Sequence, residues 1–301
     1  MTTPFKKGDL VIHSKHPEWG PGKVALVLPA YIFVFFRNQA GRRASKFPLP
    51  AVQLELAASQ SDAILDNLPP FEQVGADVVF GAERLAPKET VALFLERFPD
   101  GFKDPAYVGS ERDYKWKAHV LCQQLLSPVE IRRLLAEDDV PQLVQRVSKV
   151  VSSQNLLSRF ESAALHGALA LPEAAGRFLT ALAELTDAPD DQTILQRYLQ
   201  ACAALPQTGA TKPFQWPVVT LLPFLARPDV QLCLKPEVTK VAAGRLGFDL
   251  KYQATPNLET YRALLRLGST WFHVIEMLQP KDMIDVQSFI YVTGGGYDTK
   301  N

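Results

Sequence analysis

Hydrophobic residues follow two different rhythms along this chain. Up to about residue 56, short apolar runs are separated by glycine- and proline-rich turns, whereas from residue 87 onward apolar residues recur every three to four positions. The first rhythm is typical of short strands and the second of amphipathic helices. The sequence therefore predicts a mostly α-helical protein with a small β-rich module at its N-terminus.

The N-terminal module has five short stretches with strand character. These stretches are residues 8–13, 23–28, 31–37, 42–47 and 52–56. Between the first two, the prolines and glycines of residues 17–22 favour turns and exclude a helix. Because five strands of this length can close on themselves, we expect a small closed β-barrel over residues 1–60. Gly20 and Gly22 are expected to adopt backbone angles that other residues avoid.

The rest of the chain contains a series of amphipathic helices joined by short turns. The first is expected to begin at Pro87, which suits the first turn of a helix, and to place Val91, Phe94 and Phe98 on one face. Later helices are expected to begin at the N-caps Ser110, Ser127 and Thr255. No repeat of fixed length is present, so we predict one large α-helical domain over residues 87–301.

Three segments depart from these patterns. Residues 61–86 mix polar spacing with a short apolar run, and we assign them to a connector between the domains. Residues 206–234 contain five prolines and few charges, which indicates a buried, irregular segment. The glycine-rich end of the chain from residue 294 is expected to be flexible.

The tryptophans of the helical domain, Trp116, Trp216 and Trp271, are interpreted as core residues.

Composition limits the class of protein. The chain has 301 residues, of which 47% are hydrophobic and 21% charged, as in ordinary globular proteins. It shows no apolar leader, and no run approaches the roughly 18–20 apolar residues of a membrane span. The cysteines are too widely spaced for a zinc site or a disulfide framework. We therefore expect a cytoplasmic protein without a metal and without a cofactor.

Charge is distributed unevenly along the sequence. Residues 1–60 contain eight basic and three acidic side chains, a net charge of +5, whereas the remainder contains 24 basic and 29 acidic ones, a net charge of −5. A basic module favours a polyanion or an acidic protein surface as its partner. A few exposed lysines on a small domain would produce the same count, so charge alone leaves both explanations open.

The residues of the module carry a resemblance. The pattern GDxVxH at residues 8–13, PxWGxGxV at 17–24, VxF at 34–36 and a closing segment at 46–54 resembles the Tudor/SH3-like barrel at the C-terminus of UvrD/PcrA-type helicases. It is also similar to the RNA polymerase interaction domain of the CarD and Mfd families. In those families the barrel docks chiefly on the β subunit of RNA polymerase, and some Tudor-like relatives contact nucleic acid. The resemblance covers about the first fifth of the chain and implies a binding module.

Candidate contact residues are the aromatic and basic side chains expected at turns and strand ends, which are typical interface anchors. By this criterion the partner-binding residues are Trp19, Arg37, Arg42, Arg43 and Lys46. His13 and His16 are close in sequence, but no third ligand lies nearby, so we predict no metal site there.

The helical part contains a sequence pattern that resembles a nuclease motif. Pro99-Asp100 precedes Asp113-Tyr114-Lys115, which matches the PD…(D/E)xK pattern in which two carboxylates hold Mg²⁺ and a lysine assists attack on phosphate. That chemistry requires the second half to lie on a strand. Here the segment reads as a helix, on which Asp113 and Lys115 would point away from each other. We therefore assign no catalytic residue.

A second basic cluster, formed by Lys235, Lys240 and Arg245, surrounds the expected start of a late helix. Helix N-termini favour anions, so the cluster is a candidate phosphate site. Ordinary solvated helix charges are the alternative explanation.

The sequence leads to one main hypothesis and two alternatives. The main hypothesis is a non-enzymatic interaction protein that docks on the transcription or repair machinery, with RNA polymerase as the first candidate partner. The alternatives are direct binding of DNA or RNA, and a nucleic-acid-processing enzyme that the barrel targets to its substrate.

Overall fold

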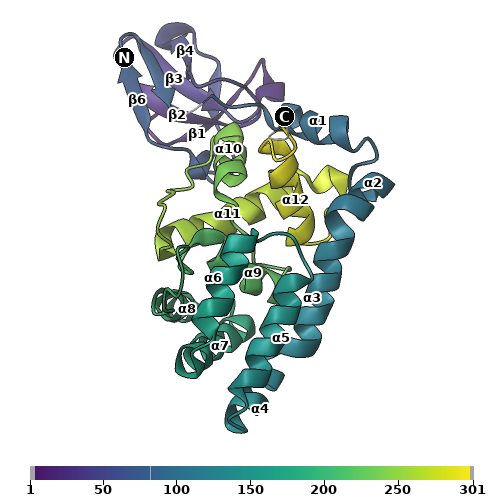
Figure 1. Ribbon diagram of the computed structural model, residues 1–301. Coiled ribbons are helices and arrows are strands. Elements are labelled where there is room, and N and C mark those ends of the chain that lie inside the picture. The colour runs from purple at the N-terminus through teal and green to yellow at the C-terminus, as the bar shows by residue number, and fades with distance from the viewer. Residues whose placement is uncertain (1–3, 82, 299–301) are drawn as a thin grey trace. The chain divides into compact units, whose positions relative to one another are not determined.

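The computed structural model describes residues 4–81 and 83–298, and the chain divides into two units (Figure 1). The sheet unit contains the chain up to Glu96 together with Lys240–Asp249. The helical unit contains Arg97–Thr239 and the chain from Leu250 onward. A strand-rich N-terminal part followed by a large helical part confirms the predicted fold class. The division differs from the predicted boundaries at residues 60 and 87 because the segment between them folds with the sheet.

A five-stranded antiparallel sheet is the centre of the sheet unit. Its strand order is β4-β3-β2-β1-β5, so that β1 to β4 form a meander and β5 returns to pair with β1 (Figure 1). Each strand overlaps one of the five predicted stretches. The strands are β1 (Leu10–His13), β2 (Gly22–Val27), β3 (Tyr31–Phe36), β4 (Ser45–Pro48) and β5 (Leu54–Leu56).

Strand β3 is buried on both faces. Ile32, Val34 and Phe36 belong to the cluster inside the sheet, together with Val11, Val24 and Leu54. Phe33 and Phe35 point to the opposite face, since successive side chains of a strand alternate. Because both faces of the strand are buried, apolar residues are required at successive positions and not only at every second one. This accounts for the sequence YIFVFF.

The hairpin of β6 (Phe71–Val74) and β7 (Asp77–Phe80) covers the second face of β3. The ring of Phe80 lies edge-on to that of Phe35, with 4.3 Å between their centres. The Ala44 backbone N–H donates to the Val78 carbonyl at 2.8 Å and so joins the hairpin to the main sheet. The predicted connector is therefore a covering layer of the sheet.

Gly20, which lies before β2, and Gly22, the first residue of β2, are glycines for different reasons. Gly20 has a φ of +70°, as expected. Gly22 does not have a positive φ; a Cβ at this position would lie 2.6 Å from side-chain atoms of both Phe36 and Val34. Close packing against the core, rather than backbone conformation, therefore requires glycine at residue 22.

Replacing Gly22 with alanine should destabilise the sheet unit by about 1–3 kcal/mol, because the core must shift to admit the methyl group. Urea unfolding of the full chain would measure this change. The matched control is Gly209→Ala, since a Cβ at Gly209 meets no atom within 4 Å. Equal stability of the two variants would contradict the packing argument.

The sheet unit is completed by a segment that returns from far along the chain. Helix α10 (Pro236–Leu246) ends beside the residues that follow β7. The Leu85 N–H donates to the Arg245 carbonyl at 2.9 Å, and the Asp249 N–H donates to the Asn67 carbonyl at 2.8 Å. Helix α1 (Pro87–Arg97) begins at the predicted proline.

Arg84 is a fully buried cation within this unit, with 1% of its surface exposed. Its Nη2 donates to the carbonyls of Phe36 at 2.9 Å and of Gln39 at 2.6 Å, and also to the carbonyl of Arg37. The guanidinium lies 4.6 Å from the centre of the Phe35 ring. Burial lowers the pKa of Arg84 to about 10, so the side chain stays charged at neutral pH. It fixes the turn after β3.

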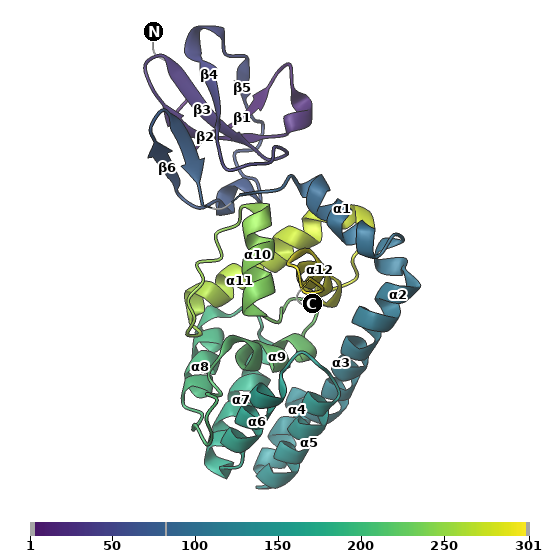
Figure 2. The same cartoon turned by 45° about the horizontal axis from the view of Figure 1, so that its top comes forward.

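The helical unit consists of packed helices, of which α3 and α5 lie side by side (Figure 2). None of the helices in residues 4–81 and 83–298 has the length and hydrophobicity that a membrane span requires. The helices are α2 (Pro105–Tyr107), α3 (Asp113–Leu126), α4 (Pro128–Ala136), α5 (Val140–Ser152), α6 (Arg159–Leu169), α7 (Pro172–Asp187), α8 (Gln192–Ala203), α9 (Trp216–Ala226), α11 (Leu258–Val274) and α12 (Met283–Thr293).

Of the three predicted N-caps, one is confirmed and two are wrong. Ser127 caps α4 by accepting from the Glu130 N–H. Asn257, rather than Thr255, caps α11. Ser110 lies inside a π-helical turn, η5 (Val108–Arg112), where its hydroxyl donates to the Ala106 carbonyl at 2.6 Å. The N-cap of this helical region lies further upstream, at Asp104, whose carboxylate accepts from the Ala106 N–H at the start of α2.

Residues 206–234 are buried in part, as predicted, but they are not irregular throughout. They contain α9, in which every residue is buried and Pro223 lies inside the helix. The interpretation of the tryptophans is confirmed for Trp216 and Trp271. It is wrong for Trp116, of which 44% is exposed.

Candidate functional site

Three predicted contact residues lie on the hairpin that joins β3 to β4. Arg42, Arg43 and Lys46 are all exposed there. Lys46 pairs with Phe33 across the strands and therefore shares a face with Tyr31, two positions away. Its Nζ lies 4.0 Å from the centre of the Tyr31 ring, which is 40% exposed. We call Tyr31, Arg42, Arg43 and Lys46 the basic hairpin.

A shallow hollow lies between the basic hairpin and the β6–β7 hairpin. Its volume is about 220 Å³, and it is lined by Arg42, Arg43, Val74, Asp77 and Val79. Arg43 forms an ion pair with Asp77 at 3.2 Å, in which both side chains are exposed. Val74 is 57% exposed. The hollow thus presents two guanidinium groups beside an exposed apolar side chain.

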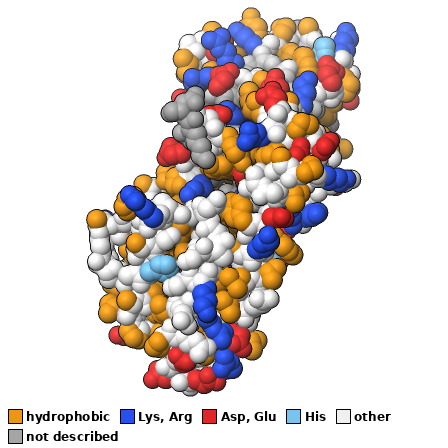
Figure 3. Space-filling model, turned by 45° about the vertical axis from the view of Figure 1, so that its right-hand side comes forward, with side chains coloured by type: hydrophobic (Ala, Val, Ile, Leu, Met, Phe, Trp, Pro, Cys, Tyr) orange, Lys and Arg blue, Asp and Glu red, His pale blue; other side chains and the backbone are white. Residues whose placement is uncertain are grey.

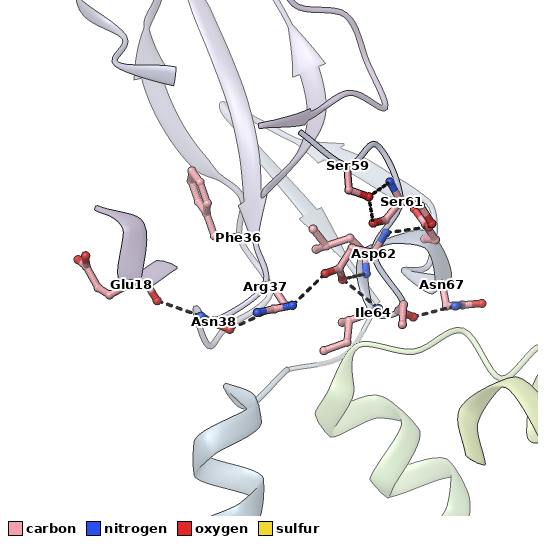
Figure 4. A network of polar contacts seen from close by, with 12 residues as sticks. Glu18, Phe36, Arg37, Asn38, Ser59, Ser61, Asp62, Ile64 and Asn67 are labelled. Carbon is pink, nitrogen blue, oxygen red and sulfur yellow. Dashed lines mark hydrogen bonds and ion pairs between the residues drawn. The ribbon is translucent and has the colours of Figure 1, made fainter. Parts of the chain in front are cut away.

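Arg37 is already engaged within the sheet unit (Figure 4). From the end of β3 its Nη1 donates to Asp62 Oδ2 at 3.1 Å. The other oxygen of Asp62 accepts from the backbone N–H groups of Ile64 and Leu65, each at 3.0 Å. Arg37 therefore joins the segment after β5 to the end of β3. This structural role accounts for the position of Arg37 without a binding partner protein.

Trp19 is half-buried rather than exposed at its turn. Its ring stacks on His16, with 4.1 Å between centres, and meets the Phe36 ring edge-on at 5.2 Å. It also packs against the core cluster of the sheet. Replacing Trp19 would change the stability of the sheet as well as any contact, so Tyr31 is the cleaner aromatic probe. The sequence analysis missed Tyr31 because a strand residue carries no turn signal.

The charge asymmetry of the sequence is much reduced in the folded unit. The sheet unit includes residues 61–96 and 240–249 in addition to residues 1–60. It contains twelve basic and eleven acidic residues in all. Asp62 and Asp77 both come from the segment that was predicted to be a connector. On the face that Figure 3 shows, basic and acidic side chains are interspersed.

The candidate phosphate cluster is not brought together. Lys235 precedes α10, whereas Arg245 lies in its last turn, so about 15 Å of helix separates them at 1.5 Å per residue. Lys240 and Arg245 belong to the sheet unit, whereas Lys235 belongs to the helical unit. There the Nζ of Lys235 donates to the Leu156 carbonyl at 2.7 Å.

In the second half of the nuclease-like pattern, Asp113 and Lys115 lie in different surroundings. Asp113 is exposed at the start of α3, whereas Lys115 is buried and donates to Glu111 at 2.7 Å and to Ser288 at 2.8 Å. The expectation that this segment is helical is confirmed. Within residues 4–81 and 83–298, no group of three or more His, Cys, Asp or Glu side chains could hold a metal ion.

A buried polar network surrounds Lys115, and the sequence analysis did not find it. Arg112, at the end of the π-helical turn, binds Asp282 through two nitrogens and Asp285 at 2.6 Å. The Tyr107 hydroxyl donates to the same oxygen of Asp285 at 2.5 Å. Single π-helical turns are frequent at functional sites. Here the turn places Glu111 and Arg112 so that both reach buried partners.

Comparison with known proteins gives one match. Residues 5–44 match a family that is described as a protein of unknown function (DUF3553). The matched segment contains β1, β2 and β3 and ends just before β4. No curated protein and no solved structure matches the chain.

Proposed function

We propose that the sheet unit is a docking module that binds a protein partner through the basic hairpin and its hollow. The first candidate partner is RNA polymerase, or another protein of transcription or repair, as the resemblance of the GDxVxH and PxWGxGxV motifs implies. The protein would act in the cytoplasm by recruitment rather than by catalysis, with the helical unit carried to the partner.

The observation that carries this proposal is the hollow beside the basic hairpin. Two arginines and the exposed Val74 line a space of about 220 Å³, and Tyr31 with Lys46 extends the same hairpin. Arginine and tyrosine side chains next to a pocket are the usual anchors of protein interfaces. An acidic or aromatic side chain of the partner would fit the hollow, because the guanidinium groups can bind a carboxylate or stack on a ring.

A protein partner is favoured over nucleic acid by the balance of charge. Binding of a phosphate backbone depends on many unpaired cations. In the sheet unit, Arg37 and Arg43 are paired with Asp62 and Asp77, and the unit as a whole is nearly neutral. Recognition by a few anchors therefore suits this surface better than recognition by charge alone.

Binding of the full-length chain to purified bacterial RNA polymerase tests the proposal directly. We expect the Tyr31→Ala and Arg42→Ala variants to bind at least about tenfold more weakly than the wild type, as loss of an interface anchor does. Lys88→Ala is the matched control, because Lys88 is an exposed cation of the same unit outside the hollow. Immobilised chain and interferometry would give the dissociation constants.

Three results would each change the conclusion. Absence of polymerase binding would remove the proposed partner, and equal binding by the wild type and the Arg42→Ala variant would remove the proposed surface. Binding of duplex DNA or RNA that falls steeply with salt would instead identify a nucleic-acid-binding module. Circular dichroism of each variant would separate lost contacts from lost folding.

A further inference from the structure

The helical unit contains a polar cavity that the docking proposal does not use. Its volume is about 270 Å³, and it lies between the π-helical turn with the start of α3, the segment after α5, and α12 with the residues that follow it. At about 30 Å³ per water in the liquid, this space corresponds to roughly nine water molecules. It can therefore hold a small metabolite but not a peptide segment.

The cavity carries an excess of positive charge. Lys115 is 1% exposed and Lys235 is half-buried, and both ammonium groups line the cavity. Glu111 is its carboxylate, and it accepts from Lys115 at 2.7 Å and from the Tyr297 hydroxyl. Two ammonium groups and one carboxylate leave a net charge of about +1, which favours an anion.

Both lysines keep hydrogen-bond donors for a ligand. Lys115 uses two N–H bonds, to Glu111 and to Ser288, and Lys235 uses one, to the Leu156 carbonyl. An ammonium group has three donors, so within the described chain one N–H of Lys115 and two of Lys235 remain. Tyr114 and Tyr291 also line the cavity, and burial raises the pKa of both, so their hydroxyls are neutral donors at physiological pH.

One buried hydrogen-bond acceptor that lines the cavity has no donor bonded to it in the described chain. Gln287, on α12, is 2% exposed and lines the cavity, and its Oε1 has no hydrogen-bond partner in the described chain. A buried carbonyl oxygen without a donor is costly, so such atoms are rare unless something else satisfies them. The acceptor indicates that the occupant of the cavity presents a hydrogen-bond donor as well as an anionic group.

We propose that this cavity binds a small hydroxylated anion, either a hydroxy acid or a phosphomonoester. Its carboxylate or phosphate lies between Lys115 and Lys235, and its hydroxyl donates to Gln287 Oε1. The site is independent of the docking surface, because all the residues that form it belong to the helical unit. Of the candidate phosphate ligands Lys235, Lys240 and Arg245, only Lys235 lines this cavity.

Calorimetric titration of the full chain with matched probe pairs tests this proposal. Lactate against propionate forms the carboxylate arm, and glycerol 3-phosphate against methyl phosphate forms the phosphate arm. We expect the hydroxylated member of one pair to bind at least about tenfold more tightly than its counterpart, because only it satisfies Gln287. The arm that responds identifies the anionic group.

Two variants connect binding to the named residues. Lys235→Met should lose the binding, whereas Lys149→Met, which removes an exposed lysine outside the cavity, should retain it. Gln287→Met should bind both members of the responding pair equally. The proposal is overturned if neither hydroxylated probe binds the wild type, if Lys235→Met binds as well as the wild type, or if the hydroxyl preference survives in Gln287→Met. Lys235 is half-buried, whereas Gln287 is fully buried, so the Lys235 variant remains informative should Gln287→Met fail to fold.

Discussion

Replacing Glu111 with glutamine will destabilise the helical unit by about 3 kcal/mol, because it leaves the Lys115 ammonium buried without its counter-charge. Urea unfolding followed by circular dichroism would measure the loss. The side chains of this pair are only 1% and 6% exposed, so bulk water has little access to them.

The control for this variant is Glu173→Gln. Glu173 and Arg177 have the same i,i+4 spacing as Glu111 and Lys115, but their side chains are 85% and 55% exposed. An exposed pair of this kind contributes at most about 0.5 kcal/mol. Similar losses in the two variants would show that burial does not set the strength of the Glu111–Lys115 pair.

The loss in Glu111→Gln should also depend on pH. Burial lowers the pKa of Lys115, whereas the charge of Glu111 raises it, so removing Glu111 lowers this pKa further. The folded variant then binds fewer protons than its unfolded chain at pH values between this lowered pKa and the ordinary lysine pKa of about 10.4, and stability rises with pH in that range. The stability difference from the wild type should therefore narrow as pH increases from 7 towards that value.

Replacing Arg84 with methionine will destabilise the sheet unit by about 3 kcal/mol or more. The substitution leaves three carbonyl oxygens without their shared donor, those of Phe36, Arg37 and Gln39. Hydrogen–deuterium exchange of peptides from β3 would locate the loss in the sheet unit. Arg42→Met removes an exposed guanidinium from the same unit and should exchange as the wild type does. Unchanged exchange in Arg84→Met would mean that other contacts hold the turn after β3.

The strands of the sheet and several helix starts could be predicted because their signals are local. Glycine and proline separate the strands, and Ser127 with Pro128 marks the start of α4 within a few residues. Helix α9 could not be predicted in this way. All its residues are buried, so its apolar positions have no period, and its prolines suggested an irregular chain.

The residues of the cavity could not be predicted because they share no local motif. Glu111 and Lys115 meet Gln287 and Tyr297 only after the helical unit has folded. Tyr297 was expected to lie in a flexible tail, but its hydroxyl binds Glu111 and its ring lies 4.3 Å from the Arg97 guanidinium. Residues 299–301 of that tail lie outside the described part of the chain. The roles of Arg37 and Asp62 were missed for the same reason, since 25 positions separate them.

The return of residues 240–249 to the sheet unit has a consequence for synthesis on the ribosome. At a typical 5–20 residues per second, the roughly 150 residues between Glu96 and Asp249 take roughly 8–30 s to translate. During this interval Arg84 and Leu85 have emerged, but the backbone partners of Leu85 and Asn67 have not been made. The N-terminal strands therefore remain incomplete until a segment about 150 residues downstream has been synthesised, and a nascent chain that stalls before residue 249 should be a preferred target for proteases and chaperones.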